Sequence, residues 1–222
     1  MHLSPAILAA ALLLAIPAAP AQSIPLAEFS QGGLEQWEEQ RFNDRTHYRL
    51  VRIDDGRTVL HAHSRAAGSG LYRSLDLDIR DTPCLTWSWK VRNTLGDIDE
   101  STRGGDDFAA RIYVVFNRSI AFWRTRAISF VWASRKPEGE VWRNPFSDSL
   151  RMVALRSGEA QTGRWVQERV DLRRRYREQY GEAPERIEGI AVMTDTDNTG
   201  KTTEAWYGDI RLEPAEACNA SG

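Results

Sequence analysis

Two segments near the C-terminus contain residue types that could bind or transform a ligand. Residues 195–200 read DTDNTG, and residues 205–210 read AWYGDI. Carboxylate and amide oxygens are the ligands of hard cations such as Ca²⁺, and exposed Trp and Tyr rings can stack on sugars. The first segment differs from a helical calcium loop, because Trp206 stands at the twelfth position, where that loop needs a bidentate Glu. The alternative interpretation is that these Asp and Asn side chains cap a turn between strands.

A second acidic pair precedes a predicted strand. Asp106 and Asp107 follow two glycines, and residues 111–116 read RIYVVF. Because side chains alternate between the faces of a strand, Asp107, Arg111 and Tyr113 are expected on one face. The opposite face is expected to belong to the core and consists of Phe108, Ala110, Ile112 and Val114. Arg111 could hold a carboxylate of a substrate, or it could pair with Asp107.

Aromatic and cationic side chains also alternate in residues 122–126, which read FWRTR, and Trp132 lies in the next predicted strand. Aromatic rings stack on the apolar faces of sugar rings, and Arg124 could then bond a hydroxyl or a uronic carboxylate. Large aromatic side chains mostly pack in the core of a sandwich. We therefore expect only a minority of the eight Trp residues to line a site.

The histidines give a weaker signal. His61 and His63 stand two residues apart on one predicted strand, as a zinc-binding pair would. A catalytic zinc takes three protein ligands, and no His follows His63. We interpret both as exposed strand histidines. The sequence has no convincing nucleophile elbow, phosphate-binding glycine loop or Cys–His pair.

Short apolar runs separated by turn residues must position these groups. Strands are predicted at residues 46–53, 58–63, 85–91, 111–116, 127–132, 151–156, 165–170, 187–193 and 205–212. The DDGR sequence at residues 54–57 predicts a hairpin turn. One short helix is predicted on a connection, because Asp171 can cap it, Leu172, Tyr176 and Tyr180 recur every four residues, and Gly181 ends it. The pattern predicts an all-β fold, a two-sheet antiparallel sandwich of the jelly-roll type.

Composition bounds the class of protein. Residues 6–16 are apolar and the small residues 18–21 follow, which predicts a signal peptide over residues 1–21. The mature chain, residues 22–222, is expected to be periplasmic or secreted and to form one domain with a loose tail at 213–222. No later apolar stretch reaches membrane-spanning length. With 29 Lys and Arg against 31 Asp and Glu, the charge balance argues against binding nucleic acid through bulk electrostatics.

Two cysteines, Cys84 and Cys218, would enter an oxidising compartment on export. A disulfide between them would tie a central strand to the C-terminal tail. The sequence leaves this pairing open, because it does not fix the distance between the two Cα atoms.

The order of motifs resembles one bacterial family. The motifs are FSQGGLEQW at residues 29–37, SGLYR at 69–73, the strand at 85–91, GDDFAARIYVVF at 105–116, FWRTRA at 122–127, and the closing DTDNTG and AWYGDI segments. They are similar to those of the family named domain of unknown function 3047, over nearly the whole mature chain. That resemblance implies no established activity.

A more distant resemblance is to jelly-roll carbohydrate-binding and galactose-binding-like modules, through residues 29–37, 165–172 and 208–212. This resemblance implies a structural calcium held by carboxylates from the first and last strands, and Glu28 and Asp209 are the matching candidates. Together with the polar and aromatic loops, it leads us to expect an exported carbohydrate-binding domain that recognises a glycan or another small polar ligand. The expected ligand-binding residues are Asp106, Asp107, Arg111, Arg124, Trp132, Asp195, Asp197 and Trp206.

An enzyme acting on a polysaccharide is the first alternative. A glycoside hydrolase needs two carboxylates as acid and base, and Asp107 and Asp195 are the pair that the sequence offers.

In a lyase, Arg111 or Arg124 would neutralise a uronate while Tyr113 or Tyr207 moved the proton. The second alternative is a structural envelope protein whose acidic loops only bind calcium or cap turns. The sequence leaves these alternatives open, together with the oligomeric state.

Overall fold

The computed structural model describes residues 21–117 and 125–220. The strands are β1 (Ile24–Ala27), β2 (Glu38–Asn43), β3 (His47–Arg52), β4 (Thr58–Arg65), β5 (Gly68–Asp78), β6 (Cys84–Val91), β7 (Ala110–Asn117), β8 (Arg126–Ala133), β9 (Val141–Asn144), β10 (Ser147–Ser157), β11 (Val166–Asp171), β12 (Arg186–Asp195) and β13 (Thr202–Glu213). The helices of these described residues are α1 (Leu172–Tyr180) and three short 3₁₀ turns, η1 (Phe29–Gln31), η2 (Arg103–Gly105) and η4 (Ala215–Cys218).

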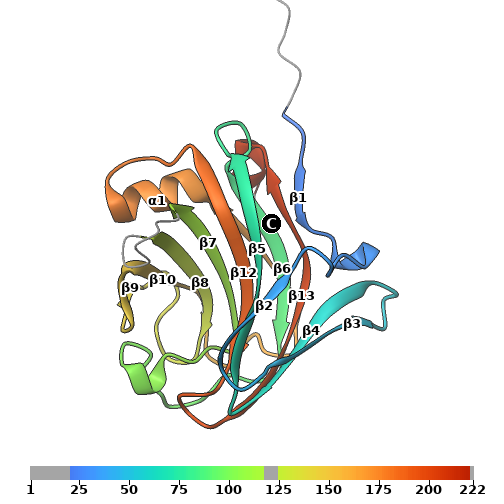
Figure 1. The fold of residues 1–222 in the computed structure, drawn as a ribbon, viewed down its shortest axis with the longest axis vertical. Helices are drawn as coiled ribbons and strands as arrows, with labels where there is room; N and C mark the ends of the chain where they lie inside the picture. Colours follow the sequence, from blue (N-terminus) through green and yellow to red (C-terminus); the bar gives the residue numbers. More distant parts are fainter. Residues whose placement is uncertain (1–20, 118–124, 221–222) are drawn as a thin grey trace, which may run out of the picture.

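Two sheets pack face to face around one main core (Figure 1). The six-stranded sheet has the order β11-β6-β13-β4-β3, with β1 also paired to β13, and the seven-stranded sheet has the order β2-β5-β12-β7-β8-β10-β9. The predicted jelly-roll-like sandwich is confirmed. One ladder departs from the antiparallel pattern, because β10 runs parallel to β8 after the crossover that contains β9.

The core explains which face each strand turns outward. Ala110, Ile112 and Val114 of β7 are fully buried in the main core, as the alternation predicted. Phe108 is fully buried, as predicted, but it does not share the face of these residues. Phe108 precedes the first residue of β7, so the strand alternation does not extend to it, and its ring packs in a separate cluster with Val131.

The strongly patterned strands lie where the sequence predicted them, and the hairpin turn at residues 54–57 joins β3 to β4 with Gly56 at a φ of 86°. The sequence missed β1, β2, β5 and β9. The strand β2 reads EEQRFN and has no apolar run, and β5 begins GSG, which indicates a turn in isolation. Pairing with neighbouring strands makes these segments extended.

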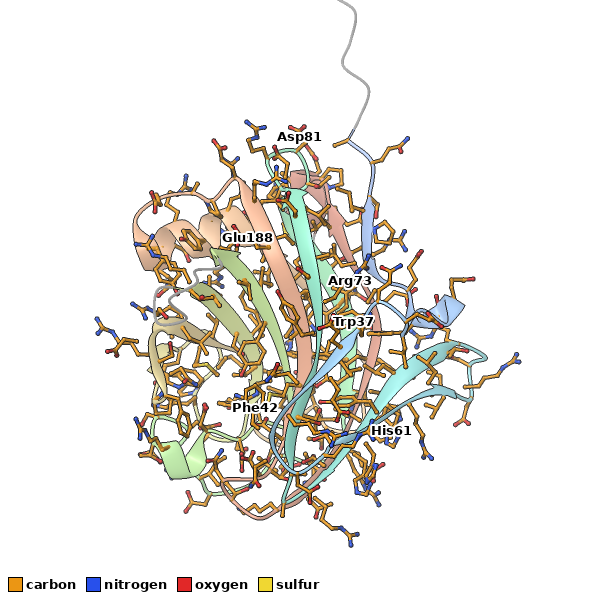
Figure 2. The ribbon with its side chains drawn as sticks, in the orientation of Figure 1. Trp37, Phe42, His61, Arg73, Asp81 and Glu188 are labelled. Carbon is orange, nitrogen blue, oxygen red and sulfur yellow. A yellow bond between two sulfur atoms is a disulfide. The ribbon has the colours of Figure 1, made fainter. Side chains whose placement is uncertain are left out.

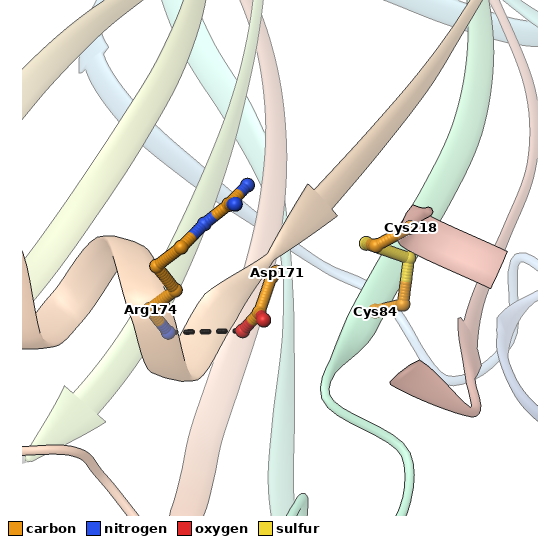
Figure 3. Close-up of a disulfide and its surroundings, with 4 residues drawn as sticks. All are labelled: Cys84, Asp171, Arg174 and Cys218. Carbon is orange, nitrogen blue, oxygen red and sulfur yellow. Dashed lines mark hydrogen bonds between the residues drawn. A yellow bond between two sulfur atoms is a disulfide. The ribbon is translucent and has the colours of Figure 1, made fainter. Parts of the chain in front are cut away.

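The predicted helix is confirmed with both of its ends. The Asp171 carboxylate accepts a hydrogen bond from the Arg174 backbone N–H at 2.9 Å (Figure 3), and Gly181 ends the helix at a φ of 88°. Tyr176 packs on Phe116 with ring centroids 4.7 Å apart. Neither this nine-residue helix nor any other described helix is long and apolar enough to cross a bilayer.

Cys84 and Cys218 form a disulfide, with their Cα atoms 5.6 Å apart (Figure 3). The bond joins the start of β6 to the last turn, η4, and so ties the C-terminal tail to the six-stranded sheet. The pairing that the sequence left open is present in the structure.

Candidate functional site

A groove of about 800 Å³ lies on the face of the seven-stranded sheet that turns away from the core. Its walls and floor come from alternate positions of four adjacent strands, namely 38, 40 and 42 of β2, 70 and 72 of β5, 191, 193 and 195 of β12, and 111, 113 and 115 of β7. Alternate residues of a strand share a face, so the same pairing that buries the core residues gathers these side chains outside.

The floor of the groove is a row of residues that face one another across the strands. Ala191 pairs with Tyr72 on one side and with Tyr113 on the other. Because Ala191 is small, the sheet is hollowed between the two tyrosines, whose Cα atoms stand two strand spacings apart, about 10 Å. The Tyr72 ring leans across β12 over Gly189, where an added Cβ would lie 2.5 Å from the Tyr72 hydroxyl oxygen. Phenol rings on either side of a hollow suit a flat ligand with apolar faces.

Two phenylalanines flank this floor, one on a strand and the other in a turn. Phe42 of β2 is 66 % exposed and Phe146, between β9 and β10, is 52 % exposed. They are the exposed large hydrophobic side chains of the described chain, and both line the groove (Phe42 in Figure 2). Phe42 lies on β2 at one edge of the sheet, and Phe146 lies in the turn that follows β9, the strand at the other edge. Exposed aromatic rings beside one groove indicate a ligand-binding surface.

A cluster of carboxylates closes one end of the groove. One oxygen from each of Asp107, Asp195 and Asp197 lies within 4.8 Å of the others, so this group could hold a metal ion. The pairing of the strands explains the cluster, since β7 and β12 are antiparallel and the start of β7 therefore meets the end of β12. Asp107 precedes β7, and Asp195 ends β12.

Two of these carboxylates accept hydrogen bonds from backbone N–H groups of neighbouring segments. Asp107 accepts hydrogen bonds from the backbone N–H of Asn198 at 3.3 Å, the Asn198 side-chain amide at 3.0 Å and the backbone N–H of Thr199 at 2.7 Å. Asp195 accepts from the Phe108 backbone N–H at 3.3 Å and from Arg111. Both Asp side chains are almost fully buried. Asp107 therefore caps the turn after β12, whereas Asp195 does not cap its own turn and instead holds the segment before β7. Because both are almost fully buried, neither is presented to a substrate as an acid or base.

Arg111 is a buried counter-ion to this cluster. Its side chain is 3 % exposed, its NH2 atom pairs with Asp195, and its NH1 atom lies 3.8 Å from Asp106 Oδ1. The Phe108 ring centroid lies 5.0 Å from the guanidinium carbon, and the Tyr113 centroid lies 5.4 Å from it. Burial by itself would lower the pKa of Arg111. Tyr113 and the nearby carboxylates together have a larger effect in the opposite direction, so the pKa of Arg111 is raised.

Two carboxyl groups near Arg111, those of Asp106 and Asp197, have raised pKa values. Burial raises the pKa of Asp106, although Arg111 and a side-chain hydrogen bond from Asn144 oppose the shift. Burial and the neighbouring Asp107 raise the pKa of Asp197, which is half-buried at the groove. An added Cβ at Gly68 would lie 2.3 Å from Asp197 Oδ1, so only glycine lets the carboxylate pack there.

The structure brings together five of the residues that the sequence proposed for ligand binding and separates the others. Asp106, Asp107, Arg111, Asp195 and Asp197 meet in this cluster. Arg124 lies outside the described residues.

The two predicted tryptophans lie elsewhere. Trp132 is fully buried between the sheets, and its indole N–H donates to the Gly158 carbonyl at 3.1 Å. Trp206 lies in the six-stranded sheet, where it stacks on His61 at 5.0 Å and carries Lys90 Nζ 4.3 Å from its ring centroid. The alternation of aromatic residues in the sequence did not show which sheet or which face each ring would occupy.

The remaining predicted groups also have partners away from the groove. Asp209 accepts hydrogen bonds from the Ser30 backbone N–H at 2.9 Å and the Ser30 hydroxyl at 2.6 Å, and Glu28 Oε1 lies 3.9 Å from Arg211 NH1. Calcium at Glu28 and Asp209 stays a prediction. Tyr207 is fully buried, and burial raises its pKa, so it is no proton carrier for a lyase.

The expectation of an exposed His61 is wrong. His61 is 6 % exposed, and its Nε2 atom lies 2.8 Å from Glu204 Oε2. Burial lowers the pKa of His61 although Glu204 opposes the shift.

Sequence reasoning identified Tyr113 of the groove but missed its other aromatic residues, Phe42, Tyr72 and Phe146. Phe42 lies in a polar segment that shows no strand pattern, and Tyr72 was noted only as part of a motif. The available signal was the isolated aromatic residue itself, because Phe42 and Phe146 each stand among polar and turn residues.

Comparison with known proteins gives a family match and similar folds. The model of the family described as protein of unknown function, DUF3047, matches residues 35–211. No curated protein matches the sequence. The family 30 carbohydrate-binding module of a cellulosomal cellulase of Clostridium thermocellum is similar at a TM-score of 0.45 and 10 % identity, covering 88 % of this chain and 99 % of that one. An endoglucanase from Rhodothermus marinus is similar at a TM-score of 0.43 and 11 % identity, covering 80 % of this chain and 97 % of that one.

Proposed function

Since the chain belongs to the DUF3047 family, whose function is unknown, we propose its function from the groove itself: the protein binds a glycan on the outer face of the seven-stranded sheet. The observation that carries the proposal is the hollow between Tyr72 and Tyr113, flanked by the exposed rings of Phe42 and Phe146.

The chemistry of sugars matches this arrangement. A sugar ring has apolar C–H faces, which stack on aromatic rings, and a hydroxyl edge, which needs donors and acceptors. The groove offers aromatic side chains on its floor and flanks, and it offers Asp197, Asn198 and Gln40 as polar partners. Its volume of about 800 Å³ lies within the usual range for small-ligand sites.

Isothermal titration against a panel of oligosaccharides tests this proposal. We expect at least one glycan to bind the mature chain, and we expect Phe42→Ala and Phe146→Ala each to weaken that binding by about 2- to 10-fold, the usual value of one ring contact. Trp165→Ala is the matched control, because Trp165 packs beside Lys90, which belongs to the other sheet. The absence of heat with every glycan would refute the proposal.

A polysaccharide-cleaving enzyme is the second candidate, and one observation favours it. Asp106 and Asp197 line the groove and burial raises the pKa of both, and a carboxyl group with a raised pKa is better suited to act as a general acid than an ordinary one. Release of reducing ends, or new ultraviolet absorbance, from a polysaccharide panel would support the enzyme. If Asp197→Asn retained full cleavage activity, Asp197 would have no part in it.

Calcium binding is a further part of the proposal, and the three clustered carboxylates support it. A cation there must compete with the hydrogen bonds that Asp107 and Asp195 already accept. We expect calcium to raise the melting temperature of the mature chain relative to chelator, since only binding to the folded state does so. An Asp197→Asn variant should lose the shift, and an unchanged melting temperature would remove calcium from the proposal.

Export also belongs to the proposal, and its support is the apolar run at residues 6–16 followed by small residues. N-terminal sequencing of the protein from the periplasm or medium should begin at Gln22. A chain that keeps residues 1–21 in the cell would contradict export.

A further inference from the structure

The charges that line the groove are unbalanced. Four lining side chains are carboxylates, those of Glu38, Asp106, Asp195 and Asp197, and Arg111 is the single cation among the described lining residues. Asp195 and Arg111 form an ion pair, so the pair contributes little net charge. The remaining described carboxylates of the lining, those of Glu38, Asp106 and Asp197, therefore favour positive charge in the groove.

Arg111 is not placed to receive an anionic sugar. Its side chain is 3 % exposed, NH2 is taken by Asp195, and neither Nε nor NH1 finds a hydrogen-bond partner although both are buried. The sequence offered Arg111 as the residue that holds a substrate carboxylate. Its pairing with Asp195 and the nearby Asp106 carboxylate argue against that role.

Asp197 is the carboxylate best placed to meet a ligand. It is half-buried at the groove, and no side chain or backbone group of another described residue donates a hydrogen bond to it within the usual distance. Its position is fixed from behind, because it packs directly on the Gly68 backbone. A buried carboxylate gains most from a partner that brings a full positive charge.

The aromatic floor has the same preference. The face of a tyrosine ring attracts a cation, and the attraction grows when water is partly excluded. Tyr72 and Tyr113 stand on either side of Ala191, in the row next to the one that holds Arg111 and Met193. An ammonium group in the hollow would therefore have phenol rings beside it and carboxylates at one end of the groove.

Resting on the proposed glycan function, we infer that the glycan bears amino groups: the groove takes an ammonium-bearing sugar in preference to an uncharged one and disfavours uronates. The aromatic floor, the Asp197 carboxylate and the buried position of Arg111 all act in this direction.

A charge series on one backbone tests the inference. The probes are β-1,4-linked hexamers of glucosamine, glucose and glucuronic acid, titrated in chelator at pH 6 and low salt, where ordinary amines are protonated. Chelator is present because calcium at Asp107, Asp195 and Asp197 would cancel the negative charge that the inference uses. We expect the glucosamine hexamer to bind at least tenfold more tightly than the glucose hexamer, and the glucuronate hexamer at least tenfold more weakly. The differences should shrink as salt rises, because ions screen the charges.

Two variants test the role of Asp197. Asp197→Asn removes the charge, and Gly68→Ala keeps the charge but displaces the carboxylate, since the new Cβ would lie 2.3 Å from Oδ1. Both should reduce affinity for the glucosamine hexamer at least fivefold more than affinity for the glucose hexamer. Asp81→Asn is the control, because Asp81 is an exposed carboxylate far from Phe42 (Figure 2). Circular dichroism confirms that each variant is folded.

The outcomes distinguish failure of the amino-sugar preference from failure of the proposed glycan binding. If the glucose or glucuronate hexamer binds as tightly as the glucosamine hexamer, the inference fails while glycan binding stands. If none of the three binds but another glycan of the panel does, the inference also fails. If no glycan of any charge binds, the proposed function fails with it.

Discussion

Replacing Arg111 with methionine tests whether the acidic end of the groove depends on its buried counter-ion. Arg111 pairs with Asp195 and lies 3.8 Å from Asp106, with side-chain exposures of 3 %, 1 % and 7 % for the three residues. Methionine keeps much of the buried side-chain length and removes the charge. Asp195 and Asp106 then remain in the same place without a cation.

The expected loss in free energy of unfolding follows from the burial of this ion pair. Breaking a buried ion pair by removing one partner costs about 3–5 kcal/mol, because the other charge stays buried and uncompensated. For a chain of this size, each kcal/mol shifts the melting temperature by about 2–4 °C. We therefore expect Arg111→Met to melt about 6–20 °C below the natural protein at pH 7.

Arg186→Met is the matched control, because Arg186 forms an Arg–Asp pair with Asp76 at 2.6 Å, with both side chains largely exposed at 46 % and 78 %. Exposed pairs contribute about 0–1 kcal/mol. Urea unfolding at pH 7, followed by tryptophan fluorescence, gives the free energy of unfolding of each variant with its slope as a check on two-state behaviour.

Two results would refute the reasoning. If Arg111→Met costs no more than Arg186→Met, Arg111 is not the compensating charge of the cluster. If adding Asp195→Asn to Arg111→Met lowers stability by the full sum of the single effects, the two residues are not coupled, since a shared ion pair makes such effects non-additive.

Three further predictions concern stability. Cys218→Ser should lower the free energy of unfolding by about 2–4 kcal/mol, because the bond to Cys84 closes a loop of 134 residues. A reductant should lower the melting temperature of the natural protein and leave that of the variant unchanged. Asp171→Ala should cost about 1 kcal/mol in urea unfolding through loss of the helix cap, and Asp171→Asn should restore most of it. Burial, opposed by Arg111, raises the pKa of Asp106, and burial with Asp107 raises that of Asp197. The folded state therefore binds these protons more tightly than the unfolded chain does, so these two groups add stability as pH falls through their raised pKa values toward 3.8 and lose it as pH rises. Urea unfolding across that range should show a flatter pH slope for Asp197→Asn, and an unchanged slope would contradict the assignment.

The parts of the fold that depend on neighbouring residues could be predicted from the sequence. Asp171, Gly181 and the four-residue spacing between them define α1, because a helix makes its hydrogen bonds within one segment. The alternation in residues 85–91 and 111–116 likewise located β6 and β7, since strand side chains alternate whatever the partner is. The acidic cluster could be anticipated in part, because its members lie in two short segments rich in Asp.

The groove could not be predicted in the same way. Phe42, Tyr72 and Tyr113 come from three strands, and Phe146 comes from a turn on the far edge of the sheet, so only strand order and register bring them together. Trp132 shows the same limit, because the alternation in β8 has two faces and only packing between the sheets decided that its ring is buried.

The sequence by itself therefore determined the β-rich class, the helix with its ends and the chemical types available for a site. The tertiary structure alone decided the pairing of Cys84 with Cys218, the burial of Arg111 and the position of each aromatic ring relative to the groove. The physical reason is that local conformation follows from short-range sterics and hydrogen bonds, whereas a binding surface depends on which distant strands pair and which face they bury.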